Sequence, residues 1–439
     1  MSEPTASAGT LDAFAALLAD RCRAVEHLLA GLPPKPERDA GQQRLAADAL
    51  ASARDMRRAF MARHAEAVYR ELTDDLRRPL RLGPLAEAAA ERFPGLVPTP
   101  AQLERERARP QADKDGLEKD QAVFFAALFH TPAAGEHLID AMLAPAPESL
   151  AQLPAFRATG RLRLPSVLLE RRGSTAELTL DNQHCLNAED NRLVADMETA
   201  VDLVALDDQV RVGVIRGAVM SHPRYLGRRV FSAGINLADL RDGALSYVDF
   251  LLGRELGCVG KLVHGVVLDP TRRSRYERAA HKPWLAAVDT FAIGGGTQIL
   301  LACDRVIAAQ DAYFSLPAAH EGIVPGLANL RLGRLTGARL ARRIVLGGHV
   351  VHAGDPEAAL LCDEVVPPEE MDTAIERAAA DLAAPAVAAN RFMLNLADEP
   401  IDQLRRYLAE FAIVQAERLY SADVLDKVER RWARSRAGR

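Results

Sequence analysis

Cysteine is scarce in this sequence, and its five copies stand far apart with no CxxC pair among 439 residues. This spacing argues against a disulfide framework and fits reduced, mostly buried thiols. The start, "MSEPTASAGTLDAF", lacks the basic and apolar regions of a signal peptide, and no apolar run approaches the roughly 18 residues of a membrane span. We therefore expect a cytoplasmic protein that does not bind a membrane.

A stripe of basic residues is also absent. The formal net charge is −5 and the basic residues are scattered along the chain, so neither nucleic acid nor an anionic membrane surface is expected as a partner. Apolar residues make up 49% of the chain, which is typical of a globular protein able to bury a large core. Local binding of a small anion is still compatible with this charge distribution.

Cofactor fingerprints are missing as well. The dinucleotide pattern GxGxxG fails because Ile299 stands where the third glycine belongs after Gly294 and Gly296. His349 and His352 have the spacing of metal ligands, but they lie beside a segment that we expect at the surface. We therefore expect no metal, flavin or nicotinamide cofactor.

The hydrophobic pattern of the sequence changes near residue 160. Before this point, apolar residues recur at helical spacing, as in "LDAFAALLADRCRAVEHLLAGL", and nothing reads as a strand. After it, short β-rich runs such as "TAELTLD" and "VRVGVIRGAV" alternate with helical runs, which indicates βαβ units and a sheet with parallel strands. We expect an α/β fold with a helical domain over residues 1–160, a catalytic core over 161–370 and C-terminal oligomerisation helices over 371–439.

Two glycine-containing turns each follow an apolar strand. The first lies at residues 232–236 within "FSAGINLADL", and the second is the triplet at 294–296 within "VDTFAIGGGTQILLACDRVIAA". Glycines usually mark sharp turns or the close approach of another molecule. In this order the two segments resemble the signature of the crotonase (enoyl-CoA hydratase/isomerase) superfamily, and the resemblance covers roughly residues 165–370. It implies a crotonase-like ββα superhelix.

The resemblance implies an oxyanion hole made of two backbone N–H groups, those of Ile235 and Gly295. An enolate formed from an acyl thioester carries negative charge on one carbonyl oxygen, and removing one fixed donor costs about 2.7–4 kcal/mol in comparable sites. Gly296 belongs to the same catalytic turn as Gly295. The residues of the first turn expected to contact the substrate are Ala233, Gly234 and Asn236.

The two glutamates that handle water in the hydratases of this superfamily are replaced here. Their positions carry Gln298 and Ala318. An amide only donates and accepts hydrogen bonds, so the addition of water would lose its acid and its base, each typically worth about 10²–10⁴-fold. With Gln298 in the catalytic turn, the site is expected to make an enolate and then to do something other than hydration.

The departures from the hydratase pattern resemble a branch of the superfamily that oxygenates arylacetyl-CoA. A long helical extension and an enlarged segment between the two turns accompany the lost glutamates. The branch converts an arylacetyl-CoA and dioxygen to an arylglyoxylate and free CoA without a cofactor, since the enolate of a dihydroxyphenyl substrate supplies the electrons. Homo-trimers or hexamers are implied too. Acyl-CoA isomerisation, thioester hydrolysis and a non-catalytic acyl-CoA-binding role remain alternatives.

Two charged residues are candidates near the acyl group. Arg254 falls on a helical stripe with Tyr247 and Phe250, where a guanidinium must snorkel, pair with an acid or face a polar ligand such as the developing charge. Glu189 follows Asn187, which we expect to cap a helix. Its carboxylate suits either the helix dipole or a hydrogen bond to a ring hydroxyl of the substrate.

The remaining candidates concern CoA. The resemblance places the segment around Leu186 along the adenine, and it puts His184 where many members carry a phosphate-contacting lysine. A replacement is expected within "SHPRYLGRR", although a solvated charge run fits as well. The candidates there are His222, Arg224, Tyr225, Arg228 and Arg229. Tyr420 either stacks on CoA from a neighbouring subunit or is a core aromatic.

Overall fold

The structure, a computed structural model, describes residues 8–427. The chain forms two compact units. The helical unit comprises the residues before Met142, the segment Ala238–Val248 and the residues from Ile401 on, and the sheet unit comprises Met142–Leu237 and Asp249–Pro400. The three regions expected from the sequence divide the chain differently, because both units share the residues after 370 and a short central segment belongs to the helical unit.

The helical unit contains no strand among its described residues. Its elements are α1 (Ala8–Ala30), η1 (Lys35–Glu37), α2 (Ala40–Leu72), α3 (Leu82–Arg92), α4 (Pro100–Arg107), η2 (Gln111–Asp113), α5 (Glu118–His130), most of α6 (Pro132–Leu143) and of α9 (Leu237–Arg241), and α18 (Ile401–Leu419). Capping boxes, Asp39 with Gln42 and Thr99 with Gln102, begin α2 and α4. They satisfy amides that a helix start leaves free.

Helix α5 forms the centre of the helical unit. Phe124, Phe125 and Phe129 are fully buried, and most other residues of the helix are buried too. Burial on every side is the pattern of a helix surrounded by others. Its main neighbours are α2 and α18. Helices from both ends of the sequence therefore share one core.

The segment Ala238–Val248 is fixed inside the helical unit by buried polar contacts. The Lys114 ammonium group donates to the Gly243 carbonyl over 2.7 Å, and the Tyr247 amide donates to Glu118 Oε1 over 2.9 Å. Lys114 and Tyr247 are almost fully buried. Because buried polar groups need partners, these contacts hold the segment in one conformation.

Seven strands form the main sheet of the sheet unit. In sheet order they are β1 (Arg161–Arg163), β2 (Val167–Arg172), β3 (Thr175–Leu180), β4 (Val212–Gly217), β7 (Trp284–Val288), β9 (Arg305–Ala309) and β12 (Glu364–Val366). The first three pair antiparallel, and the strands from β3 to β12 run parallel. The smaller strands are β5 (Val266–Val267), β6 (Ala279–Ala280), β8 (Phe291–Ile293), β10 (Tyr313–Ser315) and β11 (Val351–His352).

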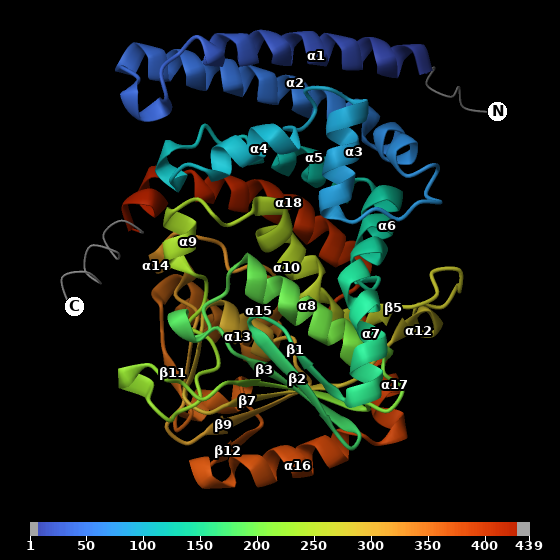
Figure 1. Ribbon diagram of the computed structural model, residues 1–439, viewed down its shortest axis with the longest axis vertical. Coiled ribbons are helices and arrows are strands. Elements are labelled where there is room, and N and C mark those ends of the chain that lie inside the picture. The colour runs from blue at the N-terminus through green and yellow to red at the C-terminus, as the bar shows by residue number, and fades with distance from the viewer. Residues whose placement is uncertain (1–7, 428–439) are drawn as a thin grey trace. The chain divides into compact units, whose positions relative to one another are not determined.

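Helices cover both faces of the main sheet (Figure 1). Helix α8 (Asn191–Leu206) packs on β2, β3 and β4, and α16 (Met371–Leu382) packs on β4, β7 and β9 from the opposite side. The other helical elements of the unit are α7 (Pro147–Thr159), η3 (Gln183–Cys185), η4 (Pro223–Tyr225), most of the π-helix η5 (Tyr247–Leu252), α10 (Gly253–Leu256), α11 (Cys258–His264), α12 (Arg275–Arg278), α13 (Gly295–Leu300), α14 (Ala318–Glu321), α15 (Ala328–Gly347), η6 (Pro356–Leu360), η7 (Pro368–Glu370) and α17 (Pro385–Asp398). Parallel strands between helices confirm the α/β prediction.

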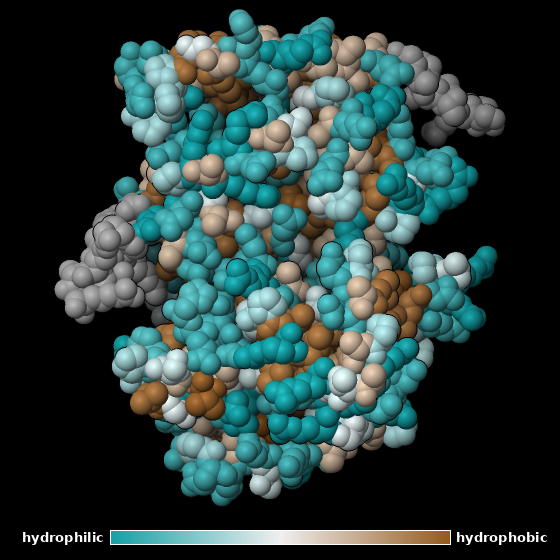
Figure 2. Space-filling model, viewed as in Figure 1, coloured by the Kyte–Doolittle hydropathy of each residue, from teal (hydrophilic) through white to brown (hydrophobic). Residues whose placement is uncertain are grey.

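Apolar side chains are concentrated in the interior of each unit. Figure 2 shows mostly hydrophilic residues on the visible face, with apolar residues in small separate groups. Within residues 8–427 no helix combines the length and the apolar character needed to cross a membrane.

His281 gives the sheet unit a measurable pH dependence. Its ring is 7% exposed, stacks on Tyr276 and packs against Phe392. Burial, aided by the charge of Arg391, lowers the pKa of His281 to about 4. The unfolded chain, in which this pKa is about 6.5, binds the proton first. The stability due to the neutral ring is therefore complete above about pH 6.5 and is lost as the pH falls to about 4.

Between pH 7 and pH 5, the free energy of unfolding should fall by about 2 kcal/mol more in the wild-type protein than in a His281→Phe variant. Urea unfolding at the two pH values measures this difference. A His352→Asn variant, changed at an exposed histidine, should keep the wild-type behaviour. The same pH dependence in wild-type and His281→Phe protein would contradict the assignment.

Candidate active site

The two glycine turns lie side by side in the sheet unit. Ser232 and Ala292 form a parallel bridge, and the Ile293 amide donates to the Ser232 carbonyl over 2.9 Å. Gly234 has a φ of +90°, and a Cβ at this position would stand 3.2 Å from the Ile293 oxygen. Gly294, with a φ of +54°, faces Gly234 in the same way. Positive φ and backbone contact both favour glycine, so the glycines allow the two turns to touch.

The amides expected to form the oxyanion hole are unpaired. The amide before Ile235 donates to Ser232 Oγ and the amide after it donates to the Glu189 carbonyl. The amide before Gly295 donates to the Ser315 carbonyl. By contrast, the N–H groups of Ile235 and Gly295 have no hydrogen-bond partner in the part of the chain that the structure describes. Two unpaired donors on adjoining turns suit the oxygen of an enolate.

Glu189 links the two turns through its backbone and its side chain. Its amide donates to the Gly234 carbonyl over 2.6 Å, and its carbonyl accepts from the Asn236 amide over 2.8 Å. These bonds bracket Ile235. The carboxylate is 2.7 Å from Arg254 Nε, and the residue is 2% exposed. Glu189 thus ties the first turn to the arginine that contacts the second.

Arg254 uses all five of its N–H groups inside the site. Nε and Nη2 donate to the Glu189 carboxylate over 2.7 and 3.0 Å. Nη1 donates to Glu255 Oε1 over 2.6 Å and to Gln298 Oε1 over 3.0 Å, and Nη2 also reaches the Gly295 carbonyl over 2.9 Å. Burial alone would lower the pKa of Arg254, but the two carboxylates raise it above its ordinary value. The guanidinium therefore pairs with acids and has no N–H left over.

The glycines of the second turn make room for this network. A Cβ at Gly295 would lie 2.1 Å from Glu189 Oε2, and one at Gly296 would lie 2.8 Å from the Ser232 Cβ. Neither distance is compatible with a side chain. The triplet is therefore required by close packing as well as by the turn itself.

Glu255 is the member of the network that sequence reasoning missed. Its Oε1 accepts from Arg254, and its Oε2 accepts from the Leu327 amide over 3.0 Å. It is 3% exposed, and a Cβ on Gly326 would stand 2.2 Å from its Oε1. The sequence did contain a signal for Glu255, since it follows an arginine that lies on an apolar stripe. A buried guanidinium needs acidic partners, and the adjacent glutamate is one.

The positions of the two hydratase glutamates hold no acid. Gln298 lies on α13 and accepts a hydrogen bond from Arg254. Ala318 is the first residue of α14 and is 4% exposed. Neither a side-chain amide nor a methyl group acts as a general acid or base at neutral pH, so these positions cannot supply the acid and the base of hydration.

Several residues expected to contact the substrate share one apolar cluster. Its buried members and the residues packed against them are Met220, Val230, Phe291, Leu186, Tyr225, Ala233, Ile293 and Tyr313. At η4, His222 and Arg224 lie exposed beside Tyr225, and the Arg224 guanidinium is 5.4 Å from the centre of the Tyr225 ring. The structure thus groups the aromatic and charged candidates of this loop on the surface next to the cluster.

Three other candidates have partners of their own. Arg228 pairs with Asp311, and Arg229 donates to a backbone carbonyl over 3.0 Å. Tyr420 belongs to the helical unit, where its hydroxyl donates to Glu118 Oε2 over 2.7 Å. Its stacking on CoA stays a prediction.

Helix α8 is capped by a different residue from the one expected. The prediction that Asn187 caps it is wrong, because Asp190 accepts a hydrogen bond from the Leu193 amide over 2.8 Å. Asn187 is fully buried and donates to the Leu180 and Val230 carbonyls. Its φ of +56° is a left-handed conformation that asparagine tolerates, so Asn187 shapes the loop before the helix.

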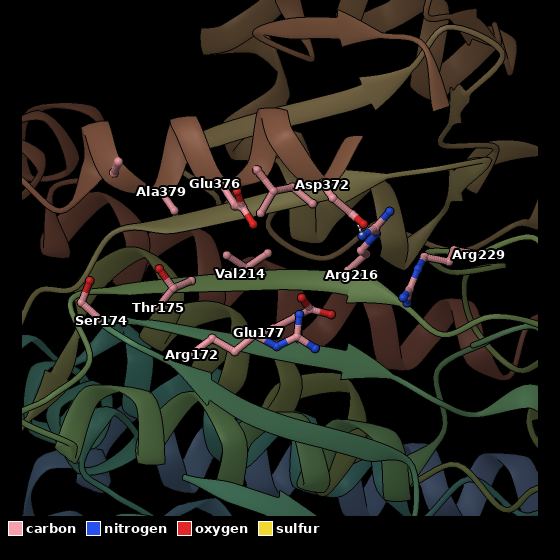
Figure 3. Close-up of a pocket in the computed structure, with 12 residues that line it drawn as sticks. Arg172, Ser174, Thr175, Glu177, Val214, Arg216, Arg229, Asp372, Glu376 and Ala379 are labelled. Atoms are coloured by element: carbon pink, nitrogen blue, oxygen red, sulfur yellow. Dashed lines mark hydrogen bonds and ion pairs between the residues drawn. The ribbon is translucent and has the colours of Figure 1, made fainter. Parts of the chain in front are cut away.

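A cavity of about 360 Å³ lies between the sheet and α16 (Figure 3). Arg216 of β4 points toward Asp372 of α16 there and also pairs with Asp289. The lining includes no residue of the two glycine turns. The candidate residues of the two turns therefore lie outside this cavity.

The chain resembles known proteins both in sequence and in fold. A family model described as enoyl-CoA hydratase/isomerase matches residues 274–424. The structure resembles that of an enoyl-CoA hydratase/isomerase from Pseudoalteromonas atlantica T6c with a TM-score of 0.51 and 22% identity, over 61% of this chain and 97% of that one. At this identity the likeness concerns the fold alone, and it confirms the predicted crotonase-like core.

Curated relatives extend the similarity to nearly the whole chain. A (3,5-dihydroxyphenyl)acetyl-CoA 1,2-dioxygenase from Amycolatopsis orientalis is 56% identical over 411 residues, which cover 94% of both chains. A short-chain-enoyl-CoA hydratase from Clostridium acetobutylicum is 29% identical over 217 residues, which cover 49% of this chain and 74% of that one. The likeness to the dioxygenase therefore includes most of the helical unit.

Proposed function

Because the chain belongs to the crotonase (enoyl-CoA hydratase/isomerase) superfamily, we propose that it stabilises a thioester enolate and oxidises it with dioxygen. Its substrate is 3,5-dihydroxyphenylacetyl-CoA, and its products are 3,5-dihydroxyphenylglyoxylate and free CoA. The observation that carries the proposal is the 56% identity to a (3,5-dihydroxyphenyl)acetyl-CoA 1,2-dioxygenase over 94% of the chain. The absence of acids at Gln298 and Ala318 supports it, since hydration would need them.

Enolate formation falls to the unpaired amides of Ile235 and Gly295. Loss of an α-proton puts negative charge on the thioester oxygen, and two fixed donors lower the barrier to that step. Glu189 brackets Ile235, and Arg254 bonds the Gly295 carbonyl. We infer that the ion pair of Glu189 and Arg254 positions the two N–H donors, because it keeps the distance between them constant.

Oxidation then uses electrons of the substrate alone. One oxygen atom of dioxygen ends on the α-carbon as a ketone and the other on the former thioester carbon as a carboxylate. The C–S bond breaks, and the two α-hydrogens leave as protons. One proton ends on the thiol of free CoA, and the other is released to solvent. No metal or organic cofactor enters this balance, because the electron-rich enolate is itself the reductant.

Substrate contacts, assembly and location complete the proposal. The acyl group meets Ala233, Gly234 and Asn236, and the residues at Leu186 and at η4 contact CoA. The protein works in the cytoplasm as a homo-trimer or hexamer, in antibiotic biosynthesis, without a nucleic-acid or membrane partner. The helices after residue 370 supply subunit contacts, and Tyr420 reaches the CoA of a neighbouring subunit.

Metal-stripped and flavin-free protein should consume one dioxygen for each CoA released from 3,5-dihydroxyphenylacetyl-CoA. An oxygen electrode and a thiol assay measure the two quantities, and phenylacetyl-CoA, whose ring is less electron-rich, should react more slowly. Activity that a chelator removes and iron restores would overturn the cofactor-free mechanism. Release of CoA without oxygen uptake would indicate a hydrolase, and binding without turnover would indicate an acyl-CoA-binding protein.

A further inference from the structure

One group of metal-ligand side chains takes no part in the proposed oxidation. His184, Cys185 and Asp190 each offer one ligand atom, and these three atoms lie within 4.8 Å of one another. Of residues 8–427, these three alone form such a group. We propose that they bind one thiophilic divalent cation, with Zn²⁺ as the reference ion.

The donor set matches the chemistry of zinc. A thiolate, an imidazole and a carboxylate are its usual protein ligands, and in a tetrahedral site with bonds near 2.0–2.3 Å the ligand atoms stand roughly 3.5 Å apart. Closing the cluster from 4.8 Å therefore needs only a small rotation. His184 is exposed and free to make it. Three protein ligands leave one position for water.

The backbone around the cluster is already fixed. Asn182 Nδ2 donates to Asp190 Oδ2 over 3.0 Å and to the Ala188 carbonyl over 3.1 Å, and the Asn182 amide donates to Asn187 Oδ1 over 2.7 Å. Ligating carboxylates normally have such an outer partner. The Cys185 sulfur stands 3.5 Å from two carbonyl oxygens, which a single S–H group cannot serve equally well. These contacts fix the position of the thiol beside the other two ligand atoms.

The cation would brace the strip of chain that supports the first glycine turn. Its ligands flank Leu186 and Glu189 in the sequence. The Leu186 carbonyl accepts from the Ala233 amide over 3.1 Å, and the Glu189 backbone bonds the residues on either side of Ile235. A cation here joins η3 to the start of α8 across that strip. Its role is structural, and it revises the expectation of a chain without metal. His349, the earlier candidate, instead lies 3.1 Å from Glu357 Oε1.

Titration of the metal-stripped full-length protein with Co²⁺ and Zn²⁺ tests the site. We expect one Co²⁺ per chain with a thiolate-to-metal charge-transfer band, and a higher unfolding temperature with Zn²⁺. Cys185→Ser should abolish the band. His184→Asn and Asp190→Asn should each weaken binding more than about tenfold. Asparagine at 190 also preserves the helix cap, so a loss there reports on the metal ligand.

Cys303→Ala and His352→Asn, changed outside the cluster, are the matched controls and should bind as the wild type does. Absence of the band in wild-type protein, or an unchanged band in Cys185→Ser, would overturn the proposal. His184→Asn provides an independent arm, because an exposed side chain can be replaced without loss of folding. None of these readouts depends on turnover, so the metal site and the proposed dioxygenase activity stand or fall separately.

Discussion

Replacement of Ile235 by proline is expected to lower turnover about 10²–10³-fold while CoA still binds. Proline removes the backbone N–H itself, which no side-chain truncation can do. This N–H group has no hydrogen-bond partner within residues 8–427. Its neighbours are engaged with Ser232 and Glu189, so another amide of the same turn cannot take its place.

Anaerobic hydrogen–deuterium exchange at the substrate α-carbon isolates enolate formation from oxygen chemistry. Wild-type protein should catalyse the exchange and folded Ile235→Pro protein should not. Ile235→Val keeps the N–H group and should stay within a few-fold of the wild type. Circular dichroism and CoA affinity show whether the proline variant has folded. Equal exchange by wild-type and proline proteins would remove Ile235 from the mechanism.

Replacement of Arg254 by methionine is expected to destabilise the sheet unit by about 3–5 kcal/mol, since it leaves the buried carboxylates of Glu189 and Glu255 without their cation. An exposed pair should behave differently. Arg272 pairs with Asp269 at side chains that are 63% and 42% exposed, and Arg272→Met should cost at most about 1 kcal/mol.

Urea unfolding followed by the fluorescence of Trp284 measures both effects, because this tryptophan is buried in β7 of the sheet unit. Trp432, outside the described residues, is replaced by phenylalanine in all variants so that one fluorophore remains. A Glu189→Gln/Arg254→Met double variant removes one unpaired charge and should recover part of the lost stability. If Arg254→Met costs no more than Arg272→Met, the network does not hold the site together.

The turns of the site were predictable from the sequence because glycine at consecutive or turn positions marks a sharp turn or a close approach. Glycine at 234 and at 294–296 follows from backbone conformations and contacts that a side chain prevents. The replacement of the acids at Gln298 and Ala318 followed from the resemblance to the superfamily, which fixes where the two glutamates stand after the second turn. Both features were read from short segments of the sequence, although the contacts that require the glycines are long-range.

The ion-pair network was harder to predict because it depends on distant parts of the chain. Glu189 and Arg254 are 65 positions apart, and no periodicity connects them. The sequence left open whether Arg254 snorkels, pairs with an acid or faces a polar ligand, and in the fold its guanidinium pairs with Glu189 and Glu255. The cap of α8 was predicted at Asn187 and lies at Asp190, because the left-handed backbone of Asn187 keeps it in the loop before the helix.

Domain division failed to follow from composition for a related reason. The helical periodicity before residue 160 is strong, but nothing in the composition of Ala238–Val248 indicates that its polar groups are bonded to Lys114 and Glu118. Such partners are a property of tertiary packing. The hydrophobic pattern therefore identified the first stretch of the helical unit and assigned neither Ala238–Val248 nor the residues from Ile401 on to it.

The helical unit is built from separate stretches of the chain, and this limits how such a protein can have evolved. It is assembled from three stretches of the gene, one before Met142, one at Ala238–Val248 and one from Ile401 on. A single fusion to the front of an ancestral enzyme supplies only the first of these. The middle stretch lies between Ile235 and Arg254, inside the sequence of the sheet unit. The extension and the core are therefore expected to have diverged together, and recombination of the first 160 codons between distant relatives should seldom give a folded product.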